Sequence, residues 1–296
     1  MLGFSEKNKF MVQLVLPALV IMIGFELIPV ASAVWASLHR TRLYETASPF
    51  IGLANYKRLL TSSHFYTVTI LNTFLFTFVG LGIETFLGIS IALLLNRRFR
   101  GENVVRTILL FPLMISPAIS GLMFSWLFNS QFGIVDVVLS ALGLPPIMWL
   151  SGRWTAMLVV IISDVWIWTP WVTILILASL QIQPQDPVEA ARLDGANALQ
   201  VFSHVTLPYL SPVLVITLLI RTFDLFRQFD QVWAITAGGP ARSTELFSVF
   251  AYKEFFEYTR YGVGNAAALM GAMVMMVFGL VMYRTFVRLT RPGAKG

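Results

Sequence analysis

Six long apolar segments run through this 296-residue sequence, and each has the length that a helix needs to cross a bilayer. A transmembrane helix takes about 20 predominantly apolar residues. The candidate spans are approximately 10–38, 67–95, 107–128, 154–180, 209–226 and 266–287. Only 12% of the residues are charged, which is about half the fraction found in soluble domains. The sequence therefore predicts an all-α integral membrane protein with six transmembrane helices, forming a single membrane domain over residues 1–296.

The first apolar segment has some features of a signal peptide. Lys7 and Lys9 precede it, and small residues follow at 31–33. However, the apolar run of 10–38 is far longer than the ~7–15 apolar residues of a signal peptide. We therefore interpret this segment as a membrane span.

The charge and the absence of cysteine exclude several kinds of site. The formal net charge is +6, but basic residues commonly flank membrane helices, so we expect no nucleic-acid partner. With no cysteine in the chain, thiol chemistry and cysteine-ligated metals are excluded. The three histidines, His39, His64 and His204, are scattered, so we expect no metal site.

Basic residues also predict the orientation in the membrane. With six spans, both termini lie on the same side. Four arginines (Arg97, Arg98, Arg100 and Arg106) lie in one short connection, whereas residues 129–152 contain neither Lys nor Arg. Because cytoplasmic loops are enriched in Lys and Arg, both termini and the loop at 182–208 are predicted to be cytoplasmic. The segments 39–66 and 227–265 are then outer loops.

The polar loop at 182–208 carries signals for two short helices. Asp186 is suited to the N-cap, Pro187 to the first helical position and Glu189 to the third, which predicts a helix over 187–193. Gly195 can adopt the positive φ that ends a helix. A second helix is expected over 197–205, closed by Pro208. From local chemistry alone, this could be an ordinary capped connector or a rigid docking surface for a partner.

The spacing of the loop residues resembles a known motif. Glu189, Ala190 and Ala191 are followed at fixed distances by Gly195 and by Leu207-Pro208. This pattern is similar to the EAA loop of permeases of ATP-binding-cassette (ABC) importers, with Val205 in place of the usual isoleucine. Further segments resemble the carbohydrate branch of that family: residues 50–56, 96–112 and 229–240.

The resemblance implies a non-catalytic permease subunit in a prokaryotic plasma membrane. Its expected partners are a second homologous permease, two ATPase subunits, an extracytoplasmic solute-binding protein, membrane lipid and a sugar, oligosaccharide or polyol substrate. The chain lacks a G-x-x-x-x-G-K-[ST] phosphate-binding loop, so it should bind no cofactor, and ATP and Mg should bind to the partner ATPase. The implied ATPase-coupling residues are Glu189, Ala190, Ala191, Arg192, Asp194, Gly195, Leu207 and Pro208.

Ionisable residues within the apolar segments are candidates for the substrate pathway, because such groups are costly in a bilayer. They are Glu26, Glu84, Asp164, Arg221 and Asp224. We interpret Glu84 as a helix-packing residue rather than a substrate ligand. The resemblance implies that the pathway residues are Asp164, Trp168, Trp171, Arg221, Asp224, Leu225 and Gln228.

The spacing of these residues leaves alternatives open. Asp164, Trp168 and Trp171 recur on one helical face, and aromatic rings beside a polar group suit a sugar. The tryptophans could instead lie in the interfacial belt, and Arg221 with Asp224 could form a structural ion pair. An unpaired Arg221 would favour an anionic substrate, whereas an Arg221 neutralised by Asp164 or Asp224 favours a neutral one. We favour the neutral substrate.

The two alternative functions are a secondary transporter and a membrane-embedded enzyme. An ion-coupled secondary transporter of a small polar solute could use Glu26, Glu84 or Asp164, but it has no need of an EAA loop. A membrane-embedded enzyme is disfavoured because the sequence has no HExxH, GxSxG or His-rich cluster.

Overall fold

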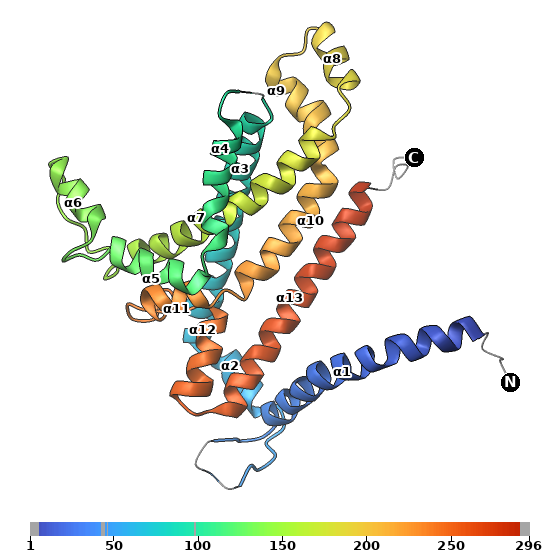
Figure 1. The fold of residues 1–296 in the computed structure, drawn as a ribbon. Helices are drawn as coiled ribbons and strands as arrows, with labels where there is room; N and C mark the ends of the chain where they lie inside the picture. The colour runs from blue at the N-terminus through green and yellow to red at the C-terminus, as the bar shows by residue number, and fades with distance from the viewer. Residues whose placement is uncertain (1–5, 43–44, 46, 98, 291–296) are drawn as a thin grey trace. The chain divides into compact units, whose positions relative to one another are not determined.

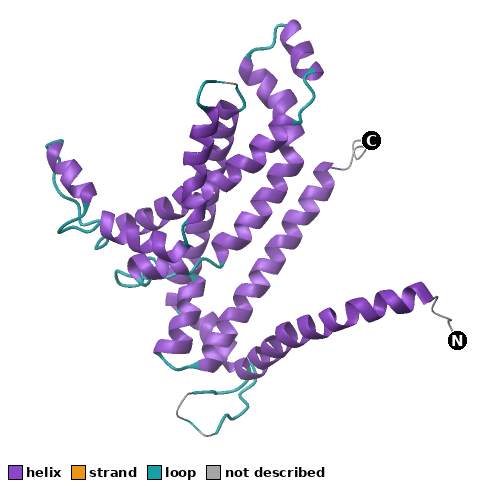
Figure 2. Ribbon diagram, in the orientation of Figure 1, coloured by secondary structure: helices purple, strands orange, loops and turns teal. Residues whose placement is uncertain are grey.

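The computed structural model describes residues 6–42, 45, 47–97 and 99–290. Figure 2 shows helices and connecting loops, and the described residues include a single isolated β-bridge, between His39 and Phe50. The all-α class is therefore confirmed. The chain divides into two compact units, residues 1–62 with 251–272 and residues 63–250 with 273–296. The single membrane domain stays a prediction.

Within the described residues, five helices are long and apolar enough to cross a membrane, and a bent pair could provide a sixth span. The five are Gln13–Ser37, Phe65–Leu95, Arg153–Gln181, Ala198–Phe226 and Tyr261–Arg284, and the pair is Glu102–Met114 with Pro117–Leu127. The predicted spans agree with these helices except at 107–128, where the pair bends by 97°.

The bend at 107–128 has a local cause. Helix α4 (Glu102–Leu110) runs into the 3₁₀ turn η2 (Phe111–Met114), and α5 (Pro117–Leu127) starts after two extended residues. Proline disfavours a helical conformation in the residue before it, and Ser116, which precedes Pro117, is extended with ψ 138°. The span predicted at 107–128 therefore corresponds to a bent pair of helices.

The larger unit is built around three long helices. The π-helical turn η1 (Phe65–Ile70) leads into α3 (Leu71–Leu95), which packs along α7 (Arg153–Gln181), and α10 (Leu207–Phe226) packs against both (Figure 1). A Cβ added at Gly88 would lie 2.6 Å from Val172 Cγ1. Glycine at this position therefore lets α3 and α7 approach closely.

Helices also occupy the segment 227–265, which was expected to be an outer loop. It contains α11 (Asp230–Thr236), α12 (Phe247–Tyr252) and the π-helical turn η4 (Lys253–Glu257). Helix α11 packs against α5 and buries Val232 and Ile235. These apolar side chains explain why α11 folds back into the larger unit, whereas residues 251–265 belong to the smaller unit. A further helix, α6 (Ile134–Ala141), precedes α7.

The smaller unit contains α1 (Glu6–Ser37), α2 (Ala54–Thr61) and the beginning of α13 (Tyr261–Thr290). The buried Asn55 side chain donates hydrogen bonds to the carbonyls of Ser37, at 2.7 Å, and His39, at 3.1 Å. These bonds satisfy carbonyls that the end of α1 leaves without a helical partner, and they join α2 to α1.

The loop at 182–208 contains α8 (Asp186–Leu193), α9 (Ala198–Val201) and the π-helical turn η3 (Phe202–Thr206). The predicted end of the second helix at Pro208 is wrong, because a continuous helical segment runs over Ala198–Phe226. Pro208 lies in the first turn of α10, where the missing N–H is tolerated. The π-helical turn before it already interrupts the regular α-helical hydrogen-bond pattern.

Candidate functional site

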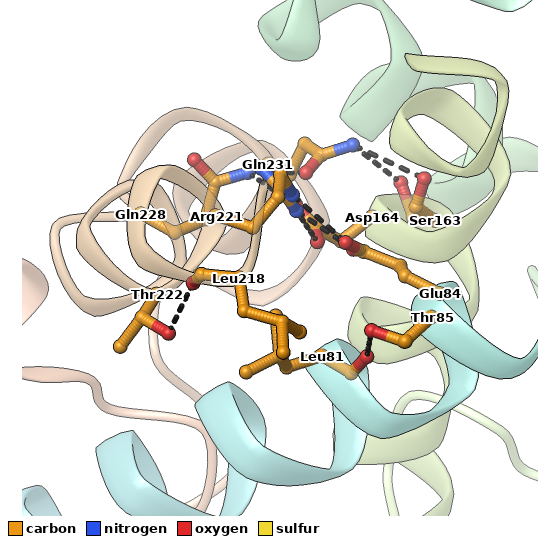
Figure 3. Close-up of polar contacts among 10 residues, drawn as sticks. All are labelled: Leu81, Glu84, Thr85, Ser163, Asp164, Leu218, Arg221, Thr222, Gln228 and Gln231. Atoms are coloured by element: carbon orange, nitrogen blue, oxygen red, sulfur yellow. Dashed lines mark hydrogen bonds and ion pairs between the residues drawn. The ribbon is translucent and has the colours of Figure 1, made fainter. Parts of the chain in front are cut away.

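A buried charged triad joins the three long helices of the larger unit. Arg221 on α10 donates from Nε to Glu84 Oε2, at 2.8 Å, and from Nη2 to Glu84 Oε1, at 2.7 Å. The same Nη2 donates to Asp164 Oδ2, at 2.8 Å. All three side chains are at most 1% exposed. Buried charges of this kind must be paired to be tolerated, so the triad fixes α3, α7 and α10 to one another (Figure 3).

Amides and hydroxyls extend the triad into a larger polar cluster. Gln228 donates to Asp164 Oδ1, at 3.0 Å, and also to the Gln231 side-chain oxygen. Gln231, fully buried on α11, donates to the hydroxyls of Ser120 and Ser163, each at 3.2 Å. Figure 3 shows Gln231 between Gln228 and Ser163. We call these seven residues the polar cluster: Glu84, Ser120, Ser163, Asp164, Arg221, Gln228 and Gln231.

Only one of the two predicted tryptophans lies at the triad. The Arg221 guanidinium carbon is 4.8 Å from the ring centroid of Trp168, a cation–π distance. Trp171 instead packs against a buried apolar cluster that includes Ile176 and Leu210. Of the two tryptophans at i+4 and i+7 from Asp164, Trp168 therefore lies beside the charges and Trp171 does not.

The remaining predicted pathway residues on α10, Asp224 and Leu225, make no hydrogen bond or ion pair with the triad in the described part of the chain. Asp224 accepts a hydrogen bond from Arg227, at 2.7 Å, so the alternative of a structural ion pair between Arg221 and Asp224 is wrong. The reason is that Arg221 is already held by two acidic residues on other helices. Leu225 is fully buried in the apolar core.

Sequence reasoning missed Ser120 and Gln231. Ser120 lies in the bent segment that was expected to be a plain span, and Gln231 lies in the segment expected to be an outer loop. Gln228 precedes α11, which begins at Asp230, so no helical spacing in the sequence linked Gln231 to it. Burial of α11 against α5 brings these side chains into the polar cluster.

The helix α8 begins one residue earlier than the sequence predicted. Its N-cap residue is Gln185, whose carbonyl accepts from the N–H groups of Val188 and Glu189, both at 2.9 Å. The expected N-cap at Asp186 is therefore wrong, because Gln185 already occupies the position. Asp186 and Glu189 lie in the first turn of α8, where negative charge interacts favourably with the helix dipole.

The end of α8 agrees with the predicted break at Gly195. Its φ is +84°, a left-handed conformation that favours glycine. The N–H of Ala196 donates to Ala191 O, at 3.0 Å, and the N–H of Gly195 donates to Arg192 O, at 3.1 Å. These two bonds form a Schellman motif, which fixes the direction in which the chain leaves α8.

The second helix of the loop starts with a capping box at Asn197. The N–H of Gln200 donates to Asn197 Oδ1, at 3.0 Å, and the N–H of Asn197 donates to Gln200 Oε1, at 2.8 Å. Helix α9 is therefore capped at its start, and the connection from α8 through Gly195 is rigid at both ends. The helix start expected at 197 agrees with this cap, but the reciprocal bonding with Gln200 was not predicted.

The surface of the loop combines charged and apolar side chains. Glu189, Ala190, Arg192 and Asp194 are exposed. Two leucines are also unusually exposed, with Leu193 at 88% and Leu199 at 75%. Exposed leucines rimmed by charge are typical of a protein-docking surface. Ala191 is half-buried, and Leu207 and Pro208 belong to the first turn of α10.

Residues 84–291 match the family described as the inner membrane component of binding-protein-dependent transport systems. The chain is 38% identical to the trehalose/maltose transport system permease protein MalF of Thermococcus litoralis, over 90% of each chain. It is 32% identical to the trehalose transport system permease protein SugA of Mycobacterium tuberculosis, over 95% of this chain and 88% of that one. Its fold is similar to that of a bacterial alginate ABC transporter solved in complex with an alginate pentasaccharide-bound periplasmic protein. The TM-score is 0.84 at 22% identity, and 98% of each chain is covered.

Proposed function

The chain belongs to the family of inner membrane components of binding-protein-dependent transport systems, and on that premise we propose that it is the permease subunit of an ATP-driven sugar importer. Two relatives that align over most of its length are permeases of trehalose or of trehalose and maltose transport systems. The proposed substrate is therefore a sugar, oligosaccharide or polyol.

The observation that carries the proposal is the structure of the loop at 182–208, which we call the coupling loop. Its first helix ends in a Schellman motif at Gly195 and its second begins with a capping box at Asn197. A surface that transmits movement must be rigid, and these two motifs provide that rigidity. The exposed Leu193 and Leu199 would contact an ATPase subunit, with Glu189, Arg192 and Asp194 providing charged contacts at the rim.

The proposed assembly contains the partners that a chain without its own ATP site requires. Two ATPase subunits would bind ATP and Mg, and a second homologous permease would complete the pathway. An extracytoplasmic binding protein would deliver the sugar, since the similar alginate transporter was solved in complex with a periplasmic protein. Both termini and the coupling loop would lie in the cytoplasm, and the chain itself would have no catalytic role.

The charged triad supports a neutral substrate. Arg221 makes three hydrogen bonds to two carboxylates, so its charge is already compensated within the protein. An anionic substrate would have to compete with Glu84 and Asp164 for the same guanidinium. Asp164, Gln228 and the Trp168 ring would instead offer hydrogen bonds and an apolar face to sugar hydroxyls and ring carbons.

Purification of the tagged chain from its native host in mild detergent tests the assembly. The proposal expects a second six-helix subunit and an ATPase to co-purify, with ATP hydrolysis stimulated by the sugar-loaded binding protein. A chain that purifies alone and takes up solute in response to an ion gradient would contradict it. That result would support a secondary transporter that uses the buried carboxylates.

A further inference from the structure

Four arginines surround a small cavity in the smaller unit, which contains neither the polar cluster nor the coupling loop. The cavity is about 190 Å³ and is lined by residues that follow α1, by residues of α2 and by the beginning of α13. Its charged lining residues are Arg40, Arg42, Arg58 and Arg260. Nothing in the importer function described above uses this cavity.

The charge at the cavity is not balanced by acids. Arg40 and Arg42 share one carboxylate, Glu45, at 3.6 and 3.5 Å. Arg260 lies 3.5 Å from Glu254. Arg58 has no acidic partner among the described residues. Four guanidinium groups therefore face two carboxylates, which makes the cavity attractive to an anion.

A hydroxyl group at the cavity also has an unused hydrogen-bonding capacity. Thr41 lines the cavity, and its Oγ1 is buried without a hydrogen-bond partner in the described part of the chain. Buried polar atoms are normally satisfied by protein or by a bound molecule. An anion with several oxygens could accept from this hydroxyl and from Arg58 at the same time.

The backbone around the cavity is held in place by several close contacts. Asn55 bonds the end of α1, as described above, and the N–H of Ile51 donates to Leu38 O, at 2.9 Å. A Cβ at Gly262 would lie 2.9 Å from Asn55 Nδ2, so glycine is required for α13 to start this close to α1 and α2. The arginines are therefore presented by a fixed frame.

The depth of the cavity in the membrane follows from the ends of two spans. The α1 span ends at Ser37 and the α13 span begins at Tyr261. The cavity is lined by residues that follow the first span, from Arg40, by Arg260 just before the second span, and by Gly262 and Val263 in the first turn of that second span. The polar headgroup layer lies directly outside the hydrocarbon core. Trp35, Phe50 and Leu53, which flank this region in the sequence, are exposed apolar side chains, as expected at a membrane interface.

From these observations we propose that the cavity is a binding site for a phosphate group at the outer membrane interface, with Arg58 and Thr41 as its principal ligands. A cavity of this size holds a tetrahedral anion and several waters, since one water takes about 30 Å³. Arginine is well suited to phosphate because its planar fork matches the oxygen geometry. The phosphate can come from a phospholipid headgroup or from solution.

Native mass spectrometry of the full chain tests the site directly. The chain is released from nanodiscs that contain phosphatidylglycerol or, in parallel, a glycolipid without phosphate. The proposal expects one phospholipid to be retained on the wild type, and about tenfold less retention in Arg58→Gln, because one charge-assisted hydrogen-bonding partner is lost. Thr41→Val should reduce retention by a smaller factor.

Lys57→Gln is the matched control, because Lys57 is an exposed base on the same helix that does not line the cavity. It removes the same charge and should leave retention unchanged. Inorganic phosphate titrated into the glycolipid nanodiscs distinguishes the two sources: tight binding that Arg58→Gln removes assigns the site to free phosphate. Retention that is equal in wild type and Arg58→Gln, together with no phosphate binding, would overturn the proposal. If Arg58→Gln changed only the affinity of the chain for an extracytoplasmic protein, and left lipid retention and phosphate binding unchanged, the proposal would also be overturned.

Discussion

Arg221 on α10 donates two hydrogen bonds to Glu84 on α3, at 2.8 and 2.7 Å, and a third to Asp164 on α7. Two carboxylates therefore share one guanidinium, and the triad carries a net charge of −1 when all three groups are ionised. This arrangement holds three membrane-spanning helices together at one point. Because of the charge balance, removing Arg221 and removing the Glu84 charge should have unequal effects on stability.

Removing Arg221 should destabilise the protein more than removing the Glu84 charge. Arg221→Gln leaves two buried carboxylates without a cation, which should lower the free energy of unfolding by about 3–5 kcal/mol. Glu84→Gln leaves the Arg221–Asp164 pair intact and should cost about 1–2 kcal/mol. Thermal unfolding of the detergent-solubilised variants measures both.

The exposed pair of Arg227 with Asp224 is the control for this comparison. Arg227→Gln should change the free energy of unfolding by less than about 1 kcal/mol, because exposed pairs contribute little. A Glu84→Gln variant less stable than Arg221→Gln would contradict the charge balance assigned to the triad.

Trp168 and Trp171 should differ in their effects on transport. Trp168→Ala removes the ring beside Arg221 and should raise the KM for sugar uptake, while Trp168→Phe should retain much of the affinity. Trp171→Ala removes packing against an apolar cluster and should lower the Tm with little change in KM. Uptake kinetics and Tm together separate the two, and a KM effect larger in Trp171→Ala would be inconsistent with the placement of the site.

Gly195→Ala should uncouple ATP hydrolysis from transport. The variant forces a Cβ into a left-handed conformation, at a cost of roughly 1–2 kcal/mol, and it weakens the motif that directs the chain out of α8. Gly143 is a matched control, since its φ is +74° and its surroundings are equally open, but it lies next to α6. Gly143→Ala should carry the same strain and transport normally, and equal loss of coupling in both variants would argue against a special role for Gly195.

The exposed leucines of the loop should contribute to ATPase binding and not to folding. Leu193→Gln should weaken ATPase affinity by about tenfold, because buried apolar anchors dominate interfaces, and it should leave the Tm unchanged since the side chain is 88% exposed. Leu142, 70% exposed near α6, provides a control substitution with no expected effect on affinity. Unchanged affinity in Leu193→Gln would show that this leucine lies outside the interface.

The sequence predicted the long helices and the two short helices of the 182–208 loop well because both depend on local signals. Length and apolarity define a span, and the spacing of Glu189 to Gly195 defines the short helix. The bend before Pro117 was missed because the apolar run continues through it. The contacts of Arg221 with Glu84 and Asp164 arise only through tertiary packing. Because these residues are far apart in the sequence, no local signal predicts the contacts.

The other errors have similar causes. The outer segment at 227–265 was interpreted as a loop because polar and glycine residues interrupt it, yet burial of Val232 and Ile235 folds α11 onto α5. The N-cap at Asp186 was one residue late because Gln185 has no distinctive capping chemistry. Such one-residue shifts at helix ends depend on backbone geometry that composition does not encode.

ATP-driven uptake into proteoliposomes tests the central claim most directly. The chain is reconstituted with its co-purified partners, with ATP on the side of the coupling loop and the sugar-loaded binding protein on the other side. The account predicts uptake that needs both ATP and the binding protein and that Gly195→Ala strongly reduces. Uptake by the chain alone, driven by an ion gradient and unaffected by ATP, would contradict it.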